Sequence, residues 1–332
     1  MDEQKIAMHM RRRTLLTASA IAAFPFCVNA QQGAFPLRPV RIVVPYPPGG
    51  SNDVIARLIA QKLQETWLHP VVIENKPGAA GNLGASEVAR SSPDGHTLLL
   101  NNINITSMNP VLMDRMPFNP ARDFSHISLL GTTSLALAVH PSVPANSVQE
   151  LVALLQSKPG GFSYASGGNG SPQHMAMEMF KAATKTRVVH IPYRGAGPAV
   201  ADVVGGQVEM TVSIVNQIIP HARSGRLRIL AVTSRKRLPM LPDVPTLDEA
   251  GVPGYECEIW LGLSAPAGTP GSTIETINQA VRKVMSQSDV AQKLSGQGID
   301  ILTSTPDQMR QRAAEDLKRW TEVIRTAGIK AD

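Results

Sequence analysis

The chain has 332 residues, which is enough for two domains of ordinary size. Hydrophobic residues make up 43% of it and aromatic residues only 4%, so its core must be mainly aliphatic. The formal net charge of +6 is scattered, with no stripe of Lys and Arg interleaved with aromatic residues. Such a charge can help attract a small anion, and it argues against a nucleic-acid partner.

Residues 1–30 have the pattern of an export signal. Three consecutive arginines at 11–13 precede a mostly apolar run at 15–28 that is too short to span a bilayer. Val-Asn-Ala at 28–30 fits a signal-peptidase site, so we expect cleavage after Ala30 and a periplasmic protein. The Arg-Arg pair at 12–13 resembles a twin-arginine (Tat) signal, and the general secretory (Sec) route stays open. Cleavage would leave Cys257 as the single cysteine, which excludes an internal disulfide.

Residues 40–57 predict the element around which the chain is organised. An apolar strand at 41–44 leads through Pro-Tyr-Pro-Pro-Gly-Gly into a helix that begins near Ser51. Gly50 allows the backbone to come close to a ligand. Three residues suited to cap the helix follow, Ser51, Asn52 and Asp53. The unpaired N–H groups of such a helix start can bind an anion such as a carboxylate, although the same arrangement also occurs as plain structure.

Residues 162–179 repeat this plan. A strand at 162–165 is followed by the loop Ser-Gly-Gly-Asn-Gly-Ser at 166–171 and by Pro172, which suits the first turn of a helix. The loop offers donors to an anion from the side chains of Ser166, Asn169 and Ser171 and from the backbone of Gly168 and Gly170. The same hydroxyls could equally form turns and cap the helix. Two such loops predict one anion that is held from two sides.

The strand at 41–44 is followed by strands at 71–74 and 97–101, with helical segments between them. This βαβαβ order predicts parallel strands with right-handed crossovers. Ligands of such sheets bind beyond the carboxyl ends of the strands. We therefore expect the Gly-rich loop with Ala80 and Gly81, and also Asn101, to line the site.

The rest of the chain continues the α/β pattern. Ser147 begins a helix in which Glu150 stands at the capping-box position. Further strands are expected at 127–130, 135–139, 188–191, 208–212, 228–232 and 256–264, and further helices at 272–285 and 306–327. The strand at 135–139 would lead out of a first domain and the strand at 256–264 would lead back. This predicts domain I at 36–137 plus 258–332 and domain II at 138–257.

Seven ordered segments carry a family resemblance that covers essentially the whole mature chain. They are PYPPGGSND (45–53), ENKPGAAGN (74–82), PDGHTLL (93–99), YASGGNGSPQH (164–174), PYRG (192–195), LPDVPT (241–246) and APAGTP (265–270). The chain resembles the Bug or TctC family, the periplasmic solute-binding proteins of tripartite tricarboxylate transporters. The resemblance implies a two-domain Venus-flytrap fold of the type II periplasmic-binding-protein kind, with mixed sheets flanked by helices.

The resemblance also implies what the protein binds. It implies a monomer that holds one small organic acid, or a related aromatic or amide solute, between its domains and delivers it to a membrane permease. No cofactor and no metal are implied. The residues expected to contact the solute are Tyr46, Gly50, Ser51, Asn52, Asp53, Ala80, Gly81, Asn101, Ser166, Gly168, Asn169, Gly170, Ser171, His174, Tyr193 and Asp202.

Some of these residues have a plainer interpretation. Asp53 would steady its loop more than it touches an anion, because two carboxylates repel. His174 could be a structural donor, and Asp202 could hold a water or an amine of the ligand. The polar run at 101–104 lies in a loop expected to decide which solute is bound.

Enzyme function is not expected. The sequence lacks Gly-x-Ser-x-Gly, His-Glu-x-x-His, a Walker loop and Cys-x-x-Cys. A hydrolase that uses Ser166 or Ser171 would need a histidine and an acid nearby, which the sequence does not place. A second alternative is a sensing role, in which the liganded protein docks on a membrane sensor kinase instead of a permease.

The export signal can be tested directly. Protein purified from its native envelope should begin at Gln31 by N-terminal sequencing, and full-length protein retained in the cytosol would refute the prediction. Changing Arg12→Lys and Arg13→Lys together should block export only if the twin-arginine route is used.

Overall fold

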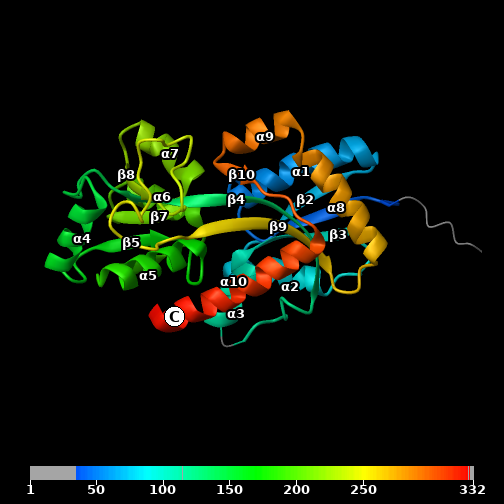
Figure 1. Ribbon diagram of the computed structural model, residues 1–332, viewed down its shortest axis with the longest axis horizontal. Helices are drawn as coiled ribbons and strands as arrows, with labels where there is room; N and C mark the ends of the chain where they lie inside the picture. Colours follow the sequence, from blue (N-terminus) through cyan, green and yellow to red (C-terminus); the bar gives the residue numbers. More distant parts are fainter. Residues whose placement is uncertain (1–34, 114, 328, 330–332) are drawn as a thin grey trace, which may run out of the picture. The chain divides into compact units, whose positions relative to one another are not determined.

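Figure 1 shows the computed structural model, which describes residues 35–113, 115–327 and 329. The described residues belong to one compact unit, Ala34–Asp332. The predicted signal at residues 1–30 and the cleavage after Ala30 lie outside the described residues. No helix in the described part combines the length and the apolar character needed to cross a membrane.

Strands and helices alternate through most of the chain (Figure 1). The strands are β1 Val40–Val44, β2 Val71–Asn75, β3 Thr97–Asn102, β4 Phe124–Val139, β5 Ser163–Ser166, β6 Val189–Pro192, β7 Met210–Ile214, β8 Arg228–Val232, β9 Glu258–Pro266 and β10 Ile299–Ile301. The α-helices are α1 Ser51–Trp67, α2 Asn82–Ala89, α3 Asn109–Leu112, α4 Val148–Ser157, α5 Pro172–Thr184, α6 Ala196–Val204, α7 Val215–Arg223, α8 Gly271–Met285, α9 Ser288–Ser295 and α10 Pro306–Ala327. Two short helical turns are η1 Ala79–Gly81 and η2 Asn104–Met108.

The described strands form one mixed sheet in the order β2-β1-β3-β9-β4-β7-β5-β6, with β8 and β10 paired to β4 off this path. β1 is parallel to β2 and β3, and β5 is parallel to β6 and β7, as the βαβ order predicts. Apolar side chains explain the central position of β1, because it is buried at every position but Arg41. The carboxyl ends of β1, β2 and β3 therefore lead into α1, η1 and η2 at one edge of the sheet.

The expectation of separate strands at 127–130 and 135–139 is wrong, because both belong to β4. Two irregularities in the pairing with β9, between His126 and Ser128 and between Leu129 and Gly131, let the strand bend and continue. At Gly131 a Cβ would lie 2.7 Å from the carbonyl oxygen of Asp300, so glycine permits β10 to approach.

β4 and β9 join the two halves of the unit (Figure 1). Up to Ser134, β4 pairs with β9, and from Leu135 onward it pairs with β7 and β8. Cys257 precedes β9 and donates its N–H to Thr233, which follows β8. The change of pairing partners lies slightly before the expected domain boundary at 137, and the division into two domains stays a prediction.

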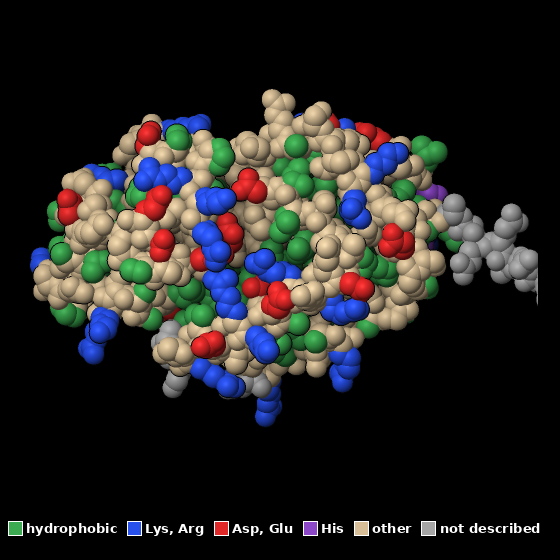
Figure 2. All heavy atoms as spheres, in the orientation of Figure 1, with side chains coloured by type: hydrophobic (Ala, Val, Ile, Leu, Met, Phe, Trp, Pro, Cys, Tyr) green, Lys and Arg blue, Asp and Glu red, His purple; other side chains and the backbone are tan. Residues whose placement is uncertain are grey.

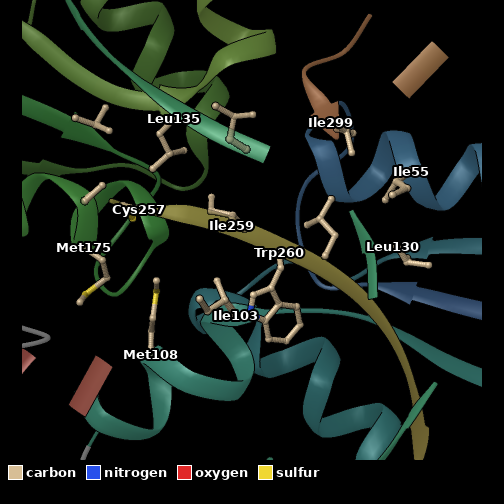
Figure 3. Packing of buried hydrophobic residues seen from close by; sticks show 14 of the residues in the cluster. Ile55, Ile103, Met108, Leu130, Leu135, Met175, Cys257, Ile259, Trp260 and Ile299 are labelled. Carbon is tan, nitrogen blue, oxygen red and sulfur yellow. The ribbon is translucent and has the colours of Figure 1, made fainter. Parts of the chain in front are cut away.

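One aliphatic core follows these two strands. Figure 3 shows Cys257, Ile259 and Trp260 following one another, with Met108 on one side and Leu135 on the other. Trp260 is 1% exposed and donates its indole N–H to Asp316 of α10 at 2.8 Å. Burial raises the pKa of the Cys257 thiol to about 12, so this cysteine is an inert core residue.

The Ser147 cap of α4 forms as predicted, although Glu150 reaches the residue before the cap, and the cap yields a stability test. The Ser147 hydroxyl accepts the N–H of Glu150 at 3.1 Å, while the Glu150 carboxylate accepts the N–H of Asn146 at 2.7 Å. Ser147→Ala should lower the free energy of unfolding by about 1 kcal/mol, because one N–H of the first turn loses its partner.

Urea denaturation followed by circular dichroism measures this difference. Ser295→Ala, at the exposed end of α9, is the control and should change stability by less than about 0.5 kcal/mol. Equal effects of the two substitutions would contradict a specific contribution from the cap.

Candidate functional site

The loop between β1 and α1 leaves backbone donors uncovered. Gly50 is the N-cap of α1, with φ −81° and ψ 170°, and its carbonyl accepts the N–H groups of Asp53 and Val54. The expectation that Ser51, Asn52 or Asp53 caps the helix is therefore wrong, because these residues lie inside its first turn and no side chain caps it. Within the described chain, the N–H groups of Ser51 and Asn52 have no hydrogen-bond partner. They are available to an anion.

Asp53 holds this loop in place. Its carboxylate accepts from the N–H of Gly49 at 3.0 Å, from Arg57 Nε at 2.9 Å and from Asn75 Nδ2 at 2.9 Å. Burial alone would raise the pKa of Asp53, but the hydrogen bonds from Arg57, Asn75 and Gly49 outweigh it and hold the pKa below its usual value. Asp53 thus stays charged and fully engaged, in agreement with the steadying role expected from the sequence.

Open space adjoins the start of α1. A Cβ built on Gly50 would meet no atom within 4 Å. The Ser51 hydroxyl and the Asn52 Oδ1 are buried, and neither has a hydrogen-bond partner among the described residues. Buried polar atoms are nearly always paired, so two unpaired oxygens beside unpaired N–H groups mark this place as a candidate binding site.

Tyr46 and Ala80 form the neighbouring wall. The Ala80 carbonyl lies 3.4 Å from the Tyr46 hydroxyl and accepts from Asn104 Nδ2 at 3.0 Å and from Asn109 Nδ2 at 3.1 Å. Ala80 has a left-handed φ of 52°, and a Cβ on Gly81 would lie 2.9 Å from the Tyr46 hydroxyl oxygen. Burial raises the pKa of Tyr46 to about 12, so its hydroxyl stays neutral.

Asn101 does not lie on this wall. It is completely buried, donates to the Ser264 hydroxyl at 3.1 Å and accepts the N–H of Asn102 at 2.8 Å. β3 pairs with β9 through this residue. Asn101 is thus engaged by the protein, and its contact with the solute stays a prediction; the residue of this polar run that adjoins Ala80 is Asn104.

The loop at 166–171 uses most of its own donors. The N–H of Gly168 donates to the Ser166 hydroxyl at 3.1 Å, and the N–H of Gly170 donates to His174 Nδ1 at 3.1 Å. Ser171 caps α5, because its hydroxyl accepts the N–H of His174 and its own N–H donates to the Gly168 carbonyl. The expectation that the N–H groups of Gly168 and Gly170 are free is therefore wrong, whereas the N–H of Gly167 has no partner among the described residues. A hydroxyl of the loop and the imidazole of His174 take up the first two donors, and contact of this loop with a solute stays a prediction.

The second set of uncovered donors comes from the start of α6. Gly195 is its N-cap, with φ 113° and no side-chain cap, and the Gly195 N–H donates to the Gly167 carbonyl. The N–H groups of Ala196 and Gly197 have no partner in the described ranges. These donors were not predicted, because the second anion-binding loop was expected at 166–171. The signal was the Pro-Tyr-Arg-Gly turn that precedes a short apolar helix.

Tyr193 and Asp202 form a pair on the same side. The Tyr193 hydroxyl donates to Asp202 Oδ2 at 2.6 Å. Burial, together with the Asp202 carboxylate, raises the pKa of Tyr193 to about 12. Asp202 is thus engaged by the protein, and a role in binding an amine of the ligand stays a prediction.

The loops of the two halves face each other closely. A Cβ on Gly195 would lie 3.1 Å from Pro47 Cγ of the β1–α1 loop. A Cβ on Gly170 would lie 3.7 Å from Asn109 Oδ1 and 3.8 Å from Ala80 Cβ. We call the space bounded by the β1–α1 loop, η1, η2, the 166–171 loop and the start of α6 the cleft.

A Ser–His contact is present but is structural. Ser166 Oγ lies 2.6 Å from His190 Nε2, which would satisfy one requirement of the hydrolase alternative. Ser166 is completely buried, however, and its hydroxyl also accepts the Gly168 N–H. A nucleophile must reach its substrate, so this geometry fits a Ser–His hydrogen bond that stabilises the loop. The described residues contain no group of three His, Cys, Asp or Glu placed to hold a metal.

A different hollow, of about 940 Å³, lies away from these loops, between α10 and residues 234–239. Basic and acidic side chains mix across the middle of the face in Figure 2. Several of those lining the hollow neutralise one another, as in Arg235–Glu256 at 2.6 Å and Arg312–Asp316 at 2.7 Å. We place the candidate site at the cleft, because among the described residues it brings the unpaired N–H groups of α1 together with the unpaired buried oxygens of Ser51, Asn52 and Asn104.

Comparison with known proteins agrees with this fold. The described unit has the α/β fold of periplasmic binding proteins, with a curled mixed sheet and flanking helices. Residues 55–329 match the family described as tripartite tricarboxylate transporter family receptor (TctC), and the chain belongs to this family of periplasmic solute receptors, which are not enzymes.

Three relatives illustrate the similarity. BugT of Bordetella pertussis is 34% identical over 324 residues, which cover 97% of this chain and 99% of BugT. The structure of Rpa4515 of R. palustris with adipate is 34% identical, with a TM-score of 0.86 over 89% of this chain and 99% of that one. MatC of Rhodopseudomonas palustris with bound malate is 32% identical, with a TM-score of 0.82 over 87% and 100% of the two chains.

The Asp53 contacts predict a pH dependence. Because the folded pKa of Asp53 is depressed, its contribution to stability is complete above the unfolded value of about 3.9 and is lost as the pH falls through the folded value. Asp53→Asn should therefore lower the free energy of unfolding by about 2 kcal/mol near neutral pH, and this difference should shrink below about pH 4.

Denaturant titrations at a series of pH values measure this difference. Asp307→Asn is the control, because Asp307 pairs with Arg310 at an exposed position and should contribute little at any pH. A difference between wild type and Asp53→Asn that stays constant down to about pH 2 would contradict the assignment.

Proposed function

We propose that this receptor binds a small carboxylate-bearing solute in the cleft and delivers it to a membrane permease of the tripartite tricarboxylate type. The observation that carries the proposal is the uncovered N-terminus of α1, with the free N–H groups of Ser51 and Asn52 beside open space at Gly50. Related receptors of known structure hold adipate and malate, which supports a carboxylate as the bound group.

The electrostatics favour an anion without a buried arginine. A helix N-terminus carries about half a positive charge, and α1 and α6 both begin at the cleft without a side-chain cap. Arg57 is committed to Asp53, and Arg194, next to the cap of α6, is exposed. The solute carboxylate is thus held by backbone donors of α1 on one side and of α6 on the other.

Binding from two sides links the solute to closure of the cleft. A solute that contacts both helix starts gains contacts in a closed form that an open form lacks, and it shifts the population toward closure. The segments able to absorb such a motion are β4 near Ser134 and the entry to β9 near Cys257, where the pairing partners change. We expect the liganded particle to be more compact by small-angle scattering.

The decisive variant fills the open space at the start of α1. Gly50→Val should reduce the affinity for the solute at least about a hundredfold, because the new side chain occupies the approach to the Ser51 and Asn52 N–H groups. Gly50 has an ordinary φ of −81° and no neighbour within 4 Å of its Cβ position, so the ligand-free protein should keep its melting temperature.

Gly271→Val is the matched control. Gly271 also stands at a helix start in open space, but its helix, α8, does not begin at the cleft: Thr273 of its first turn lies against Gly95, which precedes β3. A thermal-shift screen of di- and tricarboxylates, aromatic acids, acidic amino acids and amides finds the solute, since binding raises the melting temperature. Calorimetry then measures the variants. Equal affinities of Gly50→Val and Gly271→Val would contradict the site.

A second substitution separates backbone binding from an arginine clamp. Arg194→Ala should weaken binding by no more than about tenfold, because an exposed side chain adds only a screened attraction. Complete loss of binding in Arg194→Ala by calorimetry, with an unchanged melting temperature of the free protein, would contradict the mechanism.

Two alternatives remain distinguishable by experiment. If the liganded protein serves a sensor kinase, uptake of the solute should persist in cells that lack this receptor while the transcriptional response disappears. If the protein were a hydrolase, a screening hit would come back chemically changed by mass spectrometry, and Ser166→Ala or Ser171→Ala would stop that change.

A further inference from the structure

Asn104 carries an unsatisfied hydrogen-bond acceptor at the wall of the cleft. The residue is completely buried, and its Oδ1 has no hydrogen-bond partner in the part of the chain that the structure describes. Leaving a buried polar atom unpaired is costly, so such an atom in a folded protein calls for a partner.

The orientation of this amide is determined by its neighbours. Asn104 Nδ2 donates to the Ala80 carbonyl at 3.0 Å and to Asn109 Oδ1 at 3.1 Å. Asn109 is fixed in turn, because its Nδ2 donates to Asn82 Oδ1 at 2.7 Å and to the Ala80 carbonyl at 3.1 Å. Rotating the Asn104 amide by half a turn would place its oxygen against two acceptors. The group left over for another partner is therefore an oxygen, which can only accept.

The position of this oxygen links it to the cleft. Ala80 and Asn109, which hold the Asn104 amide, are the residues that face Gly170 of the opposite loop at 3.8 Å and 3.7 Å from its Cβ position. Asn104 is also linked to Tyr46 through Asn102, whose Oδ1 accepts the N–H of Asn104 at 3.1 Å and the Tyr46 hydroxyl at 3.3 Å. The acceptor thus belongs to the η1–η2 wall, apart from the N–H groups at the start of α1.

An acceptor and a set of N–H donors select different chemical groups. The donors at the start of α1 attract a carboxylate, whereas a carboxylate placed at Asn104 Oδ1 would meet another oxygen. The acidic residues at the cleft, Asp53 and Asp202, are each hydrogen-bonded to protein donors. Neither carboxylate is therefore free to pair with an ammonium group of a solute. The solute group that fits Asn104 Oδ1 is a neutral O–H or N–H donor.

We propose that Asn104 is a specificity-determining residue whose Oδ1 accepts a hydrogen bond from the solute, and that the solute is a small carboxylic acid that also carries a neutral donor, a hydroxyl or a carboxamide. This inference rests on the proposed function of the cleft. It distinguishes the preferred solute from plain mono- and dicarboxylates, which bring no donor to the η1–η2 wall.

Matched pairs of acids test the inference by isothermal titration calorimetry. Succinamate and levulinate differ in a terminal NH₂ against a methyl group, and malate and succinate differ in one hydroxyl. In at least one of these pairs the donor-bearing acid should bind the wild-type protein about tenfold more tightly, because it satisfies Asn104 Oδ1. In Asn104→Ala this ratio should fall to about one, since neither acid then finds the acceptor.

Asn278→Ala is the matched control, because Asn278 is also buried and its side-chain amide also donates two hydrogen bonds. Its acceptors are the carbonyls of Ile127 and Ser304, which are not part of the cleft. It should lower stability and keep the ratio. A purely structural role of Asn104 would weaken both acids of a pair equally and leave the ratio unchanged, which would overturn the inference.

The titrations also distinguish failure of this inference from failure of the proposed function. If acids bind the wild-type protein but both members of each pair bind equally, a water satisfies Asn104 and the inference fails while the proposed function stands. If no carboxylic acid binds at all, the proposed function itself fails. Should Asn104→Ala not fold, the wild-type ratios still decide, because equal binding of both members of every pair overturns the inference.

Discussion

The uncovered N-terminus of α1 is the feature on which the rest of the site depends. Gly50 caps the helix through its backbone alone, so the N–H groups of Ser51 and Asn52 stay available. The Asp53 carboxylate does not cover these N–H groups, because it accepts hydrogen bonds from Gly49, Arg57 and Asn75 instead. A carboxylate inside the first helical turn stabilises the loop without occupying the anion's place.

The sheet brings a second helix start to the same place. β1 and β6 lie far apart in the strand order, yet the bend of β4 and β9 turns their carboxyl ends toward each other, so that Pro47 approaches Gly195. Sequence-distant polar groups then fill complementary roles. Backbone donors at α1 and α6 suit a carboxylate, while the asparagine network around Ala80 leaves one acceptor for a different group.

Much of the fold could be predicted because its signals are local. Apolar runs identified β1, β3 and β8, and helix 306–327 was predicted within the same bounds as α10. The side-chain cap at Ser147 also formed as predicted. These features depend on residues within one or two turns of each other, and the sequence displays them directly.

The details of the site depended on contacts that no local pattern reveals. The N–H of Gly170 is not free, because it donates to His174 Nδ1. The side-chain amide of Asn101 donates to Ser264, which lies on a strand more than 160 residues away. β4 was divided in the prediction because its continuity comes from pairing with β9 across two irregularities. Conversely, the free donors of Ala196 follow from the absence of a cap, which a sequence does not show.

Backbone NMR of the deuterated protein during titration with a bound acid tests the two-sided grip most directly. Amide protons that donate to a carboxylate move downfield, so we predict such shifts for Ser51 or Asn52 together with Ala196 or Gly197, with a common affinity. Gly168 and Gly170, whose N–H groups already donate to Ser166 and His174, should show smaller changes. Downfield shifts confined to residues 166–171, with none at the starts of α1 and α6, would contradict the account.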